Sequence, residues 1–355
     1  MTQAINRRAL IAGGGVLALG ACATRILASP PWRALPIEPF AHKQDDIYFI
    51  SRNEGWYGNG AGRLYRTRDG GESWVKVWEH PGTYIRALGF VDAHNGFLGN
   101  VGAGFHPSAT DPVPLYRTQD GGSSWEAVVC EGIEAVKGIC AIDILRRGGK
   151  APLIHAAGRV GGPAMMLRSA DGGETWRLID LQSRAGMILD VKFLDADIGF
   201  ICAGSLSDLT QTRAAILRTT DGGAHWERVY EGERPSEICW KMSFPSRRIG
   251  YATVQNNGRG VSQQVVVKTM DAGASWQELQ LVDDAASKEL GIGFVTEDRG
   301  WLGTATTGFE TLNGGRTWQR VDFGRSVNKI RIIREGSSFS AYAIGVGVAR
   351  LDGRV

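Results

Sequence analysis

Histidine, cysteine and net charge are all scarce in this chain of 355 residues. It holds six histidines and five cysteines, and its formal net charge is only +3. Nucleic-acid binding needs a concentrated basic face, which this balance lacks, and the cysteines show none of the spacings of a metal site. We therefore expect no nucleic acid, metal or cofactor among its ligands.

Long helical patterns are also missing. No extended 3.6-residue period interrupts the short strand-like segments, and the chain is rich in glycine (49) and tryptophan (11). Both features are typical of an all-β protein. The apolar run from Ala9 to Ala21 is too short to cross a bilayer as a mature helix.

That apolar run follows Arg7-Arg8 and ends in Leu19-Gly-Ala-Cys22. The arginine pair resembles a twin-arginine export signal, and the ending resembles a bacterial lipoprotein box. We predict a signal over residues 1–21, lipidation of Cys22, a tether over 22–31 and a membrane-anchored periplasmic protein. The alternative is an ordinary cleaved signal peptide in which Cys22 stands by chance.

Four cysteines remain beyond the leader: Cys130, Cys140, Cys202 and Cys239. An even number in an oxidising compartment permits disulfides. These residues lie in apolar, strand-like runs such as Gly138–Ala141, so we expect buried free thiols.

One eight-residue motif, here called the box, occurs six times. The copies are Thr67–Trp74, Thr118–Trp125, Ser169–Trp176, Thr219–Trp226, Thr269–Trp276 and Thr311–Trp318. Their acidic or Asn positions (69, 120, 171, 221, 271 and 313) are 51, 51, 50, 50 and 42 residues apart. This period indicates a repeat architecture. Each box joins two strand-like runs, so we predict a hairpin in which glycine adopts positive φ and the Asp bonds back to the turn amides.

A second pattern precedes most boxes: a strand ending in Phe, five residues, then Gly and an aromatic residue. It occurs at Phe49–Trp56, Phe90–Phe97, Phe193–Phe200, Phe244–Tyr251 and Phe294–Trp301, and the third unit departs from it. A seventh unit, from Lys329, stops after three strands at Leu351-Asp-Gly353. The segment Trp32–Ile37 resembles the strand that follows each box. We predict a single seven-bladed β-propeller over residues 32–355, its last blade closed by this N-terminal strand.

These repeats resemble the Asp-box, or BNR-like, propellers over roughly residues 32 to 353. Within them the sequence is most similar to the photosystem II stability/assembly factor family. That resemblance implies an exported, non-catalytic propeller that binds a protein partner, with photosystem II as the client only by the family's name. We expect a monomer that serves as an assembly or stability factor for an envelope or membrane complex.

Function on a propeller concentrates on long loops carried by the rigid blades. Four long loops are expected on the face opposite the boxes: 99–114, 158–163, 204–214 and 255–264. They come from blades two to five and should form a crescent. Its polar members, and our predicted partner contacts, are His106, Asp111, Asp208, Arg213 and Arg259. The alternative is that these are merely solvated, variable loops.

Basic residues recur three positions before the acidic position of the box, at Arg66, Arg117, Arg168, Arg218 and Lys268. They could form a positive ring for an acidic partner. The structural interpretation, which we favour, lays each stem over aromatic rings of the neighbouring blade, with its head reaching solvent or the box Asp.

Asp-box propellers also include sialidases and related glycosidases, so glycan hydrolysis or glycan binding is the alternative function. It predicts at least three arginines and a Tyr–Glu pair converging at the central channel. The acid pairs Asp45-Asp46, Asp195–Asp197 and Asp283-Asp284 are expected in turns, where acids are common. No catalytic residue is assigned, and we expect the protein not to be an enzyme.

Overall fold

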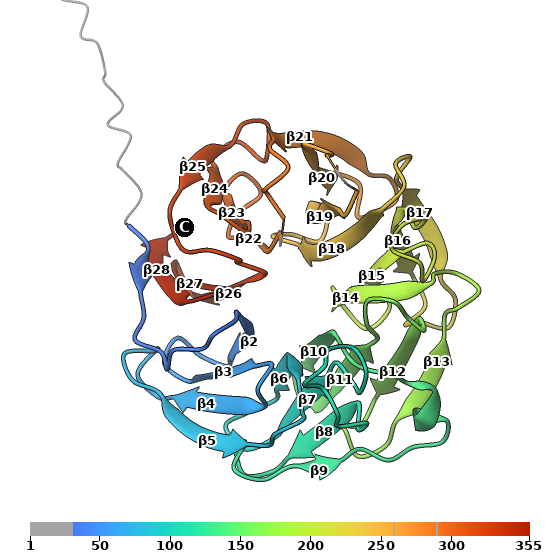
Figure 1. The fold of residues 1–355 in the computed structure, drawn as a ribbon, viewed down its shortest axis with the longest axis vertical. Helices are drawn as coiled ribbons and strands as arrows, with labels where there is room; N and C mark the ends of the chain where they lie inside the picture. Colours follow the sequence, from blue (N-terminus) through green and yellow to red (C-terminus); the bar gives the residue numbers. More distant parts are fainter. Residues whose placement is uncertain (1–30, 259, 289) are drawn as a thin grey trace, which may run out of the picture. The chain divides into compact units, whose positions relative to one another are not determined.

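The computed structural model describes residues 31–258, 260–288 and 290–355. The predicted signal over 1–21, Cys22 and Arg259 lie outside the described residues. Seven four-stranded antiparallel sheets surround a central axis, and each is one blade (Figure 1). In the described part of the chain, the helical structure is one 3₁₀ turn, η1 (Ile133–Ala135), and none of it could span a membrane.

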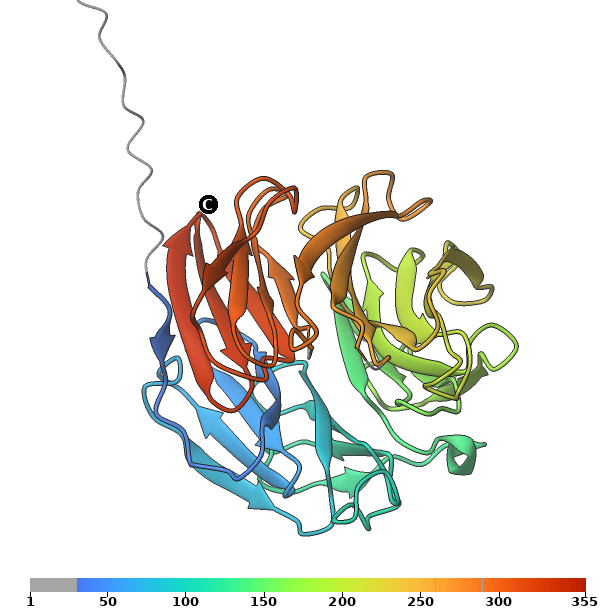
Figure 2. The same ribbon diagram turned by 45° about the horizontal axis from the view of Figure 1, so that its top comes forward.

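The strands follow the chain from the axis to the rim in each of the first six blades. Blade 1 has β2 (Gln44–Phe49), β3 (Gly55–Asn59), β4 (Arg63–Thr67) and β5 (Val75–Glu79); blade 2 has β6 (Ile85–Phe90), β7 (Gly96–Asn100), β8 (Leu115–Thr118) and β9 (Glu126–Ala127). Blade 3 has β10 (Ala141–Arg147), β11 (Lys150–Ala157), β12 (Met165–Ser169) and β13 (Arg177–Asp180). Blade 4 has β14 (Met187–Phe193), β15 (Gly199–Gly204), β16 (Ala214–Thr219) and β17 (Glu227–Glu231). Figure 2 shows the twist of these sheets.

The remaining blades continue the pattern. Blade 5 has β18 (Glu237–Ser243), β19 (Gly250–Asn256), β20 (Gln263–Thr269) and β21 (Gln277–Asp283). Blade 6 has β22 (Ile292–Phe294), β23 (Gly300–Gly303), β24 (Gly308–Thr311) and β25 (Gln319–Val321). Blade 7 has β26 (Lys329–Glu335), β27 (Ser338–Ile344), β28 (Val348–Arg354) and, from the other end of the chain, β1 (Arg33–Ala34).

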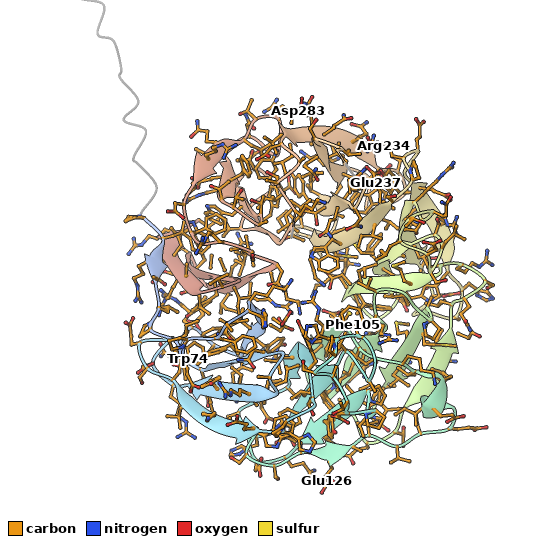
Figure 3. All side chains as sticks on the ribbon, viewed as in Figure 1. Trp74, Phe105, Glu126, Arg234, Glu237 and Asp283 are labelled. Atoms are coloured by element: carbon orange, nitrogen blue, oxygen red, sulfur yellow. The ribbon has the colours of Figure 1, made fainter. Side chains whose placement is uncertain are left out.

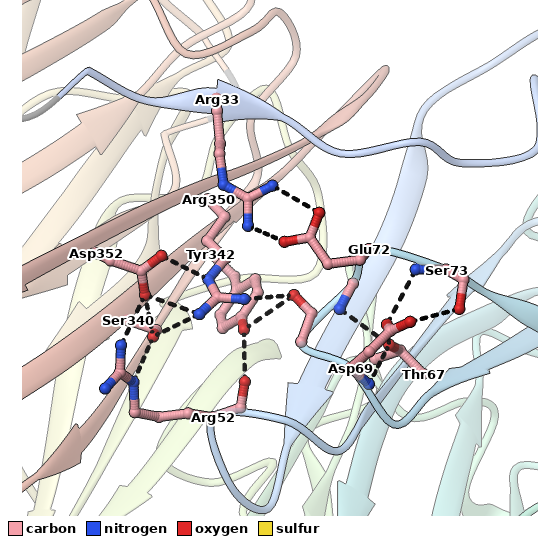
Figure 4. Close-up of polar contacts among 12 residues, drawn as sticks. Arg33, Arg52, Thr67, Asp69, Glu72, Ser73, Ser340, Tyr342, Arg350 and Asp352 are labelled. Atoms are coloured by element: carbon pink, nitrogen blue, oxygen red, sulfur yellow. Dashed lines mark hydrogen bonds and ion pairs between the residues drawn. The ribbon is translucent and has the colours of Figure 1, made fainter.

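The predicted closure of the ring is confirmed. Strand β1 pairs with β28 in the register Arg33↔Arg350 and Ala34↔Ala349. Arg33 forms an ion pair with Glu72 of the first box, and the Arg350 guanidinium donates to the carbonyl oxygen of Gly70 at 2.9 Å (Figure 4). The closing strand, with two residues, is shorter than the predicted segment 32–37. Side-chain contacts with blade 1 add to the two-residue backbone pairing at the closure.

The box hairpins form as predicted. In the first, the Asp69 carboxylate accepts hydrogen bonds from the Ser73 amide at 2.9 Å and from the Thr67 hydroxyl at 2.7 Å (Figure 4). The Thr67 hydroxyl accepts in turn from the Gly71 amide at 2.9 Å. The same bonds recur in every box, and the two central positions have positive φ. Ala272 takes the place of the first glycine in the fifth box, with φ of 59°.

The Phe–Gly–aromatic pattern specifies contacts both within and between blades. A Cβ on Gly55 would lie 2.5 Å from the Phe49 ring, so only glycine allows that ring to cover strand β3. In three blades the aromatic residue after the glycine stacks on the Phe of the next blade, as Trp56 does on Phe90 with ring centroids 3.7 Å apart. Tyr342 stacks on Phe49 at 3.8 Å, which continues this layer across the closure.

Candidate binding groove

A concave site lies on the face opposite the boxes, where blades 7, 1 and 2 meet. Its volume is about 810 Å³, and its lining includes Phe40, His42, Lys43, Tyr84, His106 and Val346. Three pairs of rings form one wall of this groove: Phe40 and His42 have centroids 5.6 Å apart, His42 and His106 6.4 Å, and Tyr84 and His106 5.9 Å. Two of these pairs are edge to face and the third is tilted, so the rings offer flat apolar surface with polar edges.

The loop that carries His106 is fixed from below by Asp111. The Asp111 carboxylate accepts from the Thr83 hydroxyl at 2.5 Å and the Tyr116 hydroxyl at 2.8 Å, and only 8% of the residue is exposed. The amides of residues 110 and 111 also donate to the Gly82 carbonyl oxygen. Asp111, predicted as a partner contact, therefore points inward and shapes the groove.

The other predicted contacts lie farther along the crescent. Asp208 and Arg213 are exposed, and the Asp208 carboxylate accepts from the Thr210 amide of its own turn at 2.8 Å. The first two long loops touch each other, and the third is hydrogen-bonded to the connection before β18. Arg159 lies 5.6 Å from the ring of Phe105, which is labelled in Figure 3, and the Ser236 hydroxyl donates to the Thr210 carbonyl oxygen at 3.0 Å. Of the predicted residues that the structure describes, only His106 lines the groove.

Sequence reasoning missed most of the groove because its lining comes from short connections. The segment before β2 supplies Phe40 and His42, and the turn before β28 supplies Val346. Loop length gives no signal for these residues. Only the closure of the ring brings blade 7 beside blade 1.

Ion pairs between the first strands of the blades line the central channel. Asp45 lies 2.8 Å from Arg86, Asp143 lies 2.7 Å from Lys192, and Asp46 lies 2.6 Å from Lys329. The Lys329 ammonium also donates to the carbonyl oxygen of Arg86, on a strand of a blade that is not its neighbour. The Lys329 side chain thus reaches past blade 1 to blade 2.

Burial and pairing oppose each other at Asp46. Burial alone would raise the pKa of Asp46, but Lys329 and Arg331 outweigh it and lower the pKa, so the carboxylate is ionised at neutral pH. Burial lowers the pKa of Lys329 to about 7, and Asp46 opposes that shift. A small cavity of about 20 Å³, lined by Lys241, Lys329 and Arg331 among others, lies beside these groups and is large enough for a water molecule.

This geometry bears on the glycosidase alternative. Asp45 and Asp46 were predicted in a turn, and this prediction is wrong. Both are fully buried within β2, where basic residues of blades 2 and 7 pack over them because the ring closes. Asp195 does lie in a turn and accepts from the Ile198 amide at 2.7 Å. Within the described residues, no group of three or more His, Cys, Asp or Glu side chains could hold a metal ion.

The basic residues before the boxes pack on aromatic rings of their own blades. Each stands opposite the aromatic residue of the second strand, and Arg66 lies 5.0 Å from the Trp56 ring while Lys268 lies 5.1 Å from the Tyr251 ring. Lys268 donates to the Gly314 carbonyl oxygen of the next box at 3.0 Å. The aromatic rings belong to the same blade, which corrects the prediction that they belong to its neighbour. The Arg66 side chain is only 11% exposed and is paired with Glu54, so it does not contribute to a positive surface ring of basic residues.

No known protein-family profile matches the chain. Two kinds of curated relative are similar to part of it. The xyloglucanase Xgh74A of Acetivibrio thermocellus is 28% identical over 232 residues, which cover 55% of this chain and 24% of that protein. The photosystem II assembly lipoprotein Ycf48 of Synechococcus sp. is 33% identical over 110 residues, 30% of this chain and 27% of that protein. The chain thus spans about a quarter of the length of each.

Solved structures agree over nearly the whole chain. A structure described as YCF48 bound to D1 peptide has a TM-score of 0.64 at 18% identity and covers 92% of this chain and 96% of its own. The GH74 xyloglucanase from Xanthomonas campestris also has a TM-score of 0.64, at 14% identity, with 90% and 53% covered. This chain is therefore a seven-bladed propeller that resembles both the Ycf48 assembly factors and the GH74 enzymes.

Proposed function

We propose that the protein is a non-catalytic propeller that binds a segment of a protein partner in the groove over blades 7, 1 and 2. The observation that carries this proposal is the wall of Tyr84, His106 and His42, with the buried Asp111 bonded to the Thr83 hydroxyl next to Tyr84. At many protein interfaces a few residues contribute most of the binding energy, and tyrosine is enriched among them. A similar propeller, YCF48, has been solved with a peptide of D1 bound, which supports a peptide as the class of ligand.

The proposal includes export and anchoring. Arg7-Arg8 and the lipoprotein motif Leu19–Cys22 support a lipid anchor at Cys22, and the partner is then a protein of the same cell envelope. In this setting the propeller acts as an assembly or stability factor for a membrane complex, as a monomer tethered by residues 22–31. The Asp-box pattern of the repeats is shared with exported propellers of this kind.

The GH74 relatives favour one second candidate, glycoside hydrolysis or glycan binding, because their match covers more of the chain than that of Ycf48. Glycoside hydrolysis commonly requires two placed carboxylates that can reach the substrate. The carboxylates of the channel are ion-paired and buried. We therefore place this function second.

The test is photo-crosslinking of the full chain, with its leader, in the native envelope. A crosslinking residue at position 106 is compared with one at position 208, since both side chains are exposed but only His106 lines the groove. One membrane protein captured from position 106 and not from 208 would support the proposal. Capture from 208 alone would move the interface to the crescent. If no specific crosslinked product forms and the protein hydrolyses xyloglucan, the proposal is wrong and the second candidate, glycoside hydrolysis, replaces it.

A further inference from the structure

Two of the four cysteines meet at the interface between blades 4 and 5. Cys202 lies on β15 and Cys239 on β18, 37 residues later, and their Sγ atoms are 2.8 Å apart. Carbon atoms in optimal contact are already about 3.5–4.0 Å apart, and sulfur is larger. The two side chains therefore face each other directly across the interface.

Their surroundings are apolar and closed to solvent. Both cysteines are fully buried in a cluster that includes Phe200, Ile216 and Val254. A disulfide is uncharged and has no hydrogen to donate, so it suits such a site at least as well as two thiols do. The geometry also leaves little for the sulfur atoms to travel, because a disulfide needs an S–S distance of about 2.05 Å.

We propose that Cys202 and Cys239 form a disulfide that joins blade 4 to blade 5 when the chain folds in an oxidising compartment. The oxidant is another disulfide, small or protein-borne. One cysteine thiolate attacks it to give a mixed disulfide, and the second cysteine displaces the leaving thiolate. In balance, two thiols lose two protons and two electrons, the new S–S bond forms, and the oxidant is reduced to two thiols.

The timing follows from burial. Burial raises the pKa of the Cys202 thiol, and the neighbouring Cys239 raises it further, so the attacking thiolate is disfavoured once the blades have packed. Exchange therefore takes place during folding, while the two strands are still accessible. Afterwards the same burial protects the bond from reductants. This bond does not depend on what the groove binds.

The experiment is peptide mapping of the full-length protein without reduction. The reduced chain is denatured and refolded in a glutathione redox buffer, its remaining thiols are alkylated, and the protein is cleaved with trypsin. We expect the peptides 193–213 and 229–241 to be recovered as one linked species that disappears on reduction, with a mass about 2 Da below the sum of the two. Cys130 and Cys140 should be alkylated.

Two further arms make the result decisive. Protein kept reduced until it has folded should form the link more slowly in the same buffer, because its thiols are buried. Cys202→Ala should lose the linked species, whereas Cys130→Ala, at a half-buried position, should retain it. Complete alkylation of Cys202 and Cys239 after oxidative refolding, or a link of either to another cysteine, would overturn the proposal, and this outcome can be read on the unmutated chain.

Discussion

The two faces of the propeller are built by opposite means. On the box face, six hairpins repeat one set of hydrogen bonds, and each Asp or Asn is used by its own turn. On the opposite face, loops of unequal length meet, and the groove combines segments from three blades. The repeated face saturates its polar groups internally and serves stability. The irregular face presents rings such as His106 to solvent and is suited to recognition.

The largest effect should come from crowding the repeated face. Gly173→Ala places a Cβ 2.2 Å from the buried Phe97 ring at a φ of 98°, whereas Gly104→Ala, in the groove-side loop, meets nothing within 4 Å at a φ of 77°. We expect a loss of about 3 kcal/mol for the first and about 1 kcal/mol for the second, since only the first adds overpacking to backbone strain. Urea unfolding measures both. Equal losses of unfolding free energy in the two variants would mean that the Phe97 ring can shift to accommodate the added Cβ at little cost.

A second prediction concerns blade 3, which departs from the Phe–Gly–aromatic pattern. His155 occupies the stacking position in blade 3 and lies on Phe193 with centroids 3.7 Å apart. Burial lowers the pKa of His155 to about 3, below the roughly 6.5 of an unfolded chain, so the unfolded state binds the extra proton between these values. Stability contributed by this site is present above pH 6.5 and is lost as the pH falls.

We expect His155 to account for about 2 kcal/mol of the stability lost between pH 7 and pH 5. His155→Phe should flatten this part of the pH profile of unfolding and leave stability at pH 7 within about 1 kcal/mol, because phenylalanine fills the equivalent positions elsewhere. Unfolding by urea at several pH values measures it. An unchanged pH profile would show that the acid-sensitive group is another one.

A third change should separate recognition from stability. His106→Ala removes an exposed ring from the groove wall, and Asp208→Ala removes an exposed carboxylate from the crescent. We expect the first to weaken partner binding about tenfold, or about 1.4 kcal/mol, and the second to leave it unchanged. Titration of immobilised variants with the partner identified by crosslinking measures affinity. The melting temperature of both variants should match that of the parent. Equal weakening would extend the site to blade 4.

The smallest effect restores the repeat. Ala272 is the one box residue in the left-handed region that is not glycine, with φ of 59°. Ala272→Gly should stabilise the protein by about 1 kcal/mol, and the reverse change in the third box, Gly172→Ala, should destabilise it by a similar amount, since a Cβ there meets nothing closer than 3.5 Å. Urea midpoints compare the pair. A neutral Ala272→Gly would indicate compensation by the larger entropy of the unfolded glycine chain.

Much of the scaffold could be predicted from the sequence because its determinants are local and repeated. A box needs only its own eight residues to form a turn. The Phe and Gly of the second pattern contact each other across two strands that a short hairpin joins. Counting these units predicted seven blades and the closure by an N-terminal strand, and both are confirmed. The position of His106 on a long loop opposite the boxes could also be read from this order.

The groove, the channel and the cysteine pair were decided by the tertiary structure. Asp46 meets Lys329 and Arg331, about 285 residues later, only because the ring closes, and nothing local distinguishes this buried acid from one in a turn. Asp111 likewise became an inward anchor through the distant hydroxyl of Thr83. The repeat by itself determined which strands pair within a blade. Which side chains face each other across the axis, and between blades, depended on the curvature that closes seven sheets into one ring.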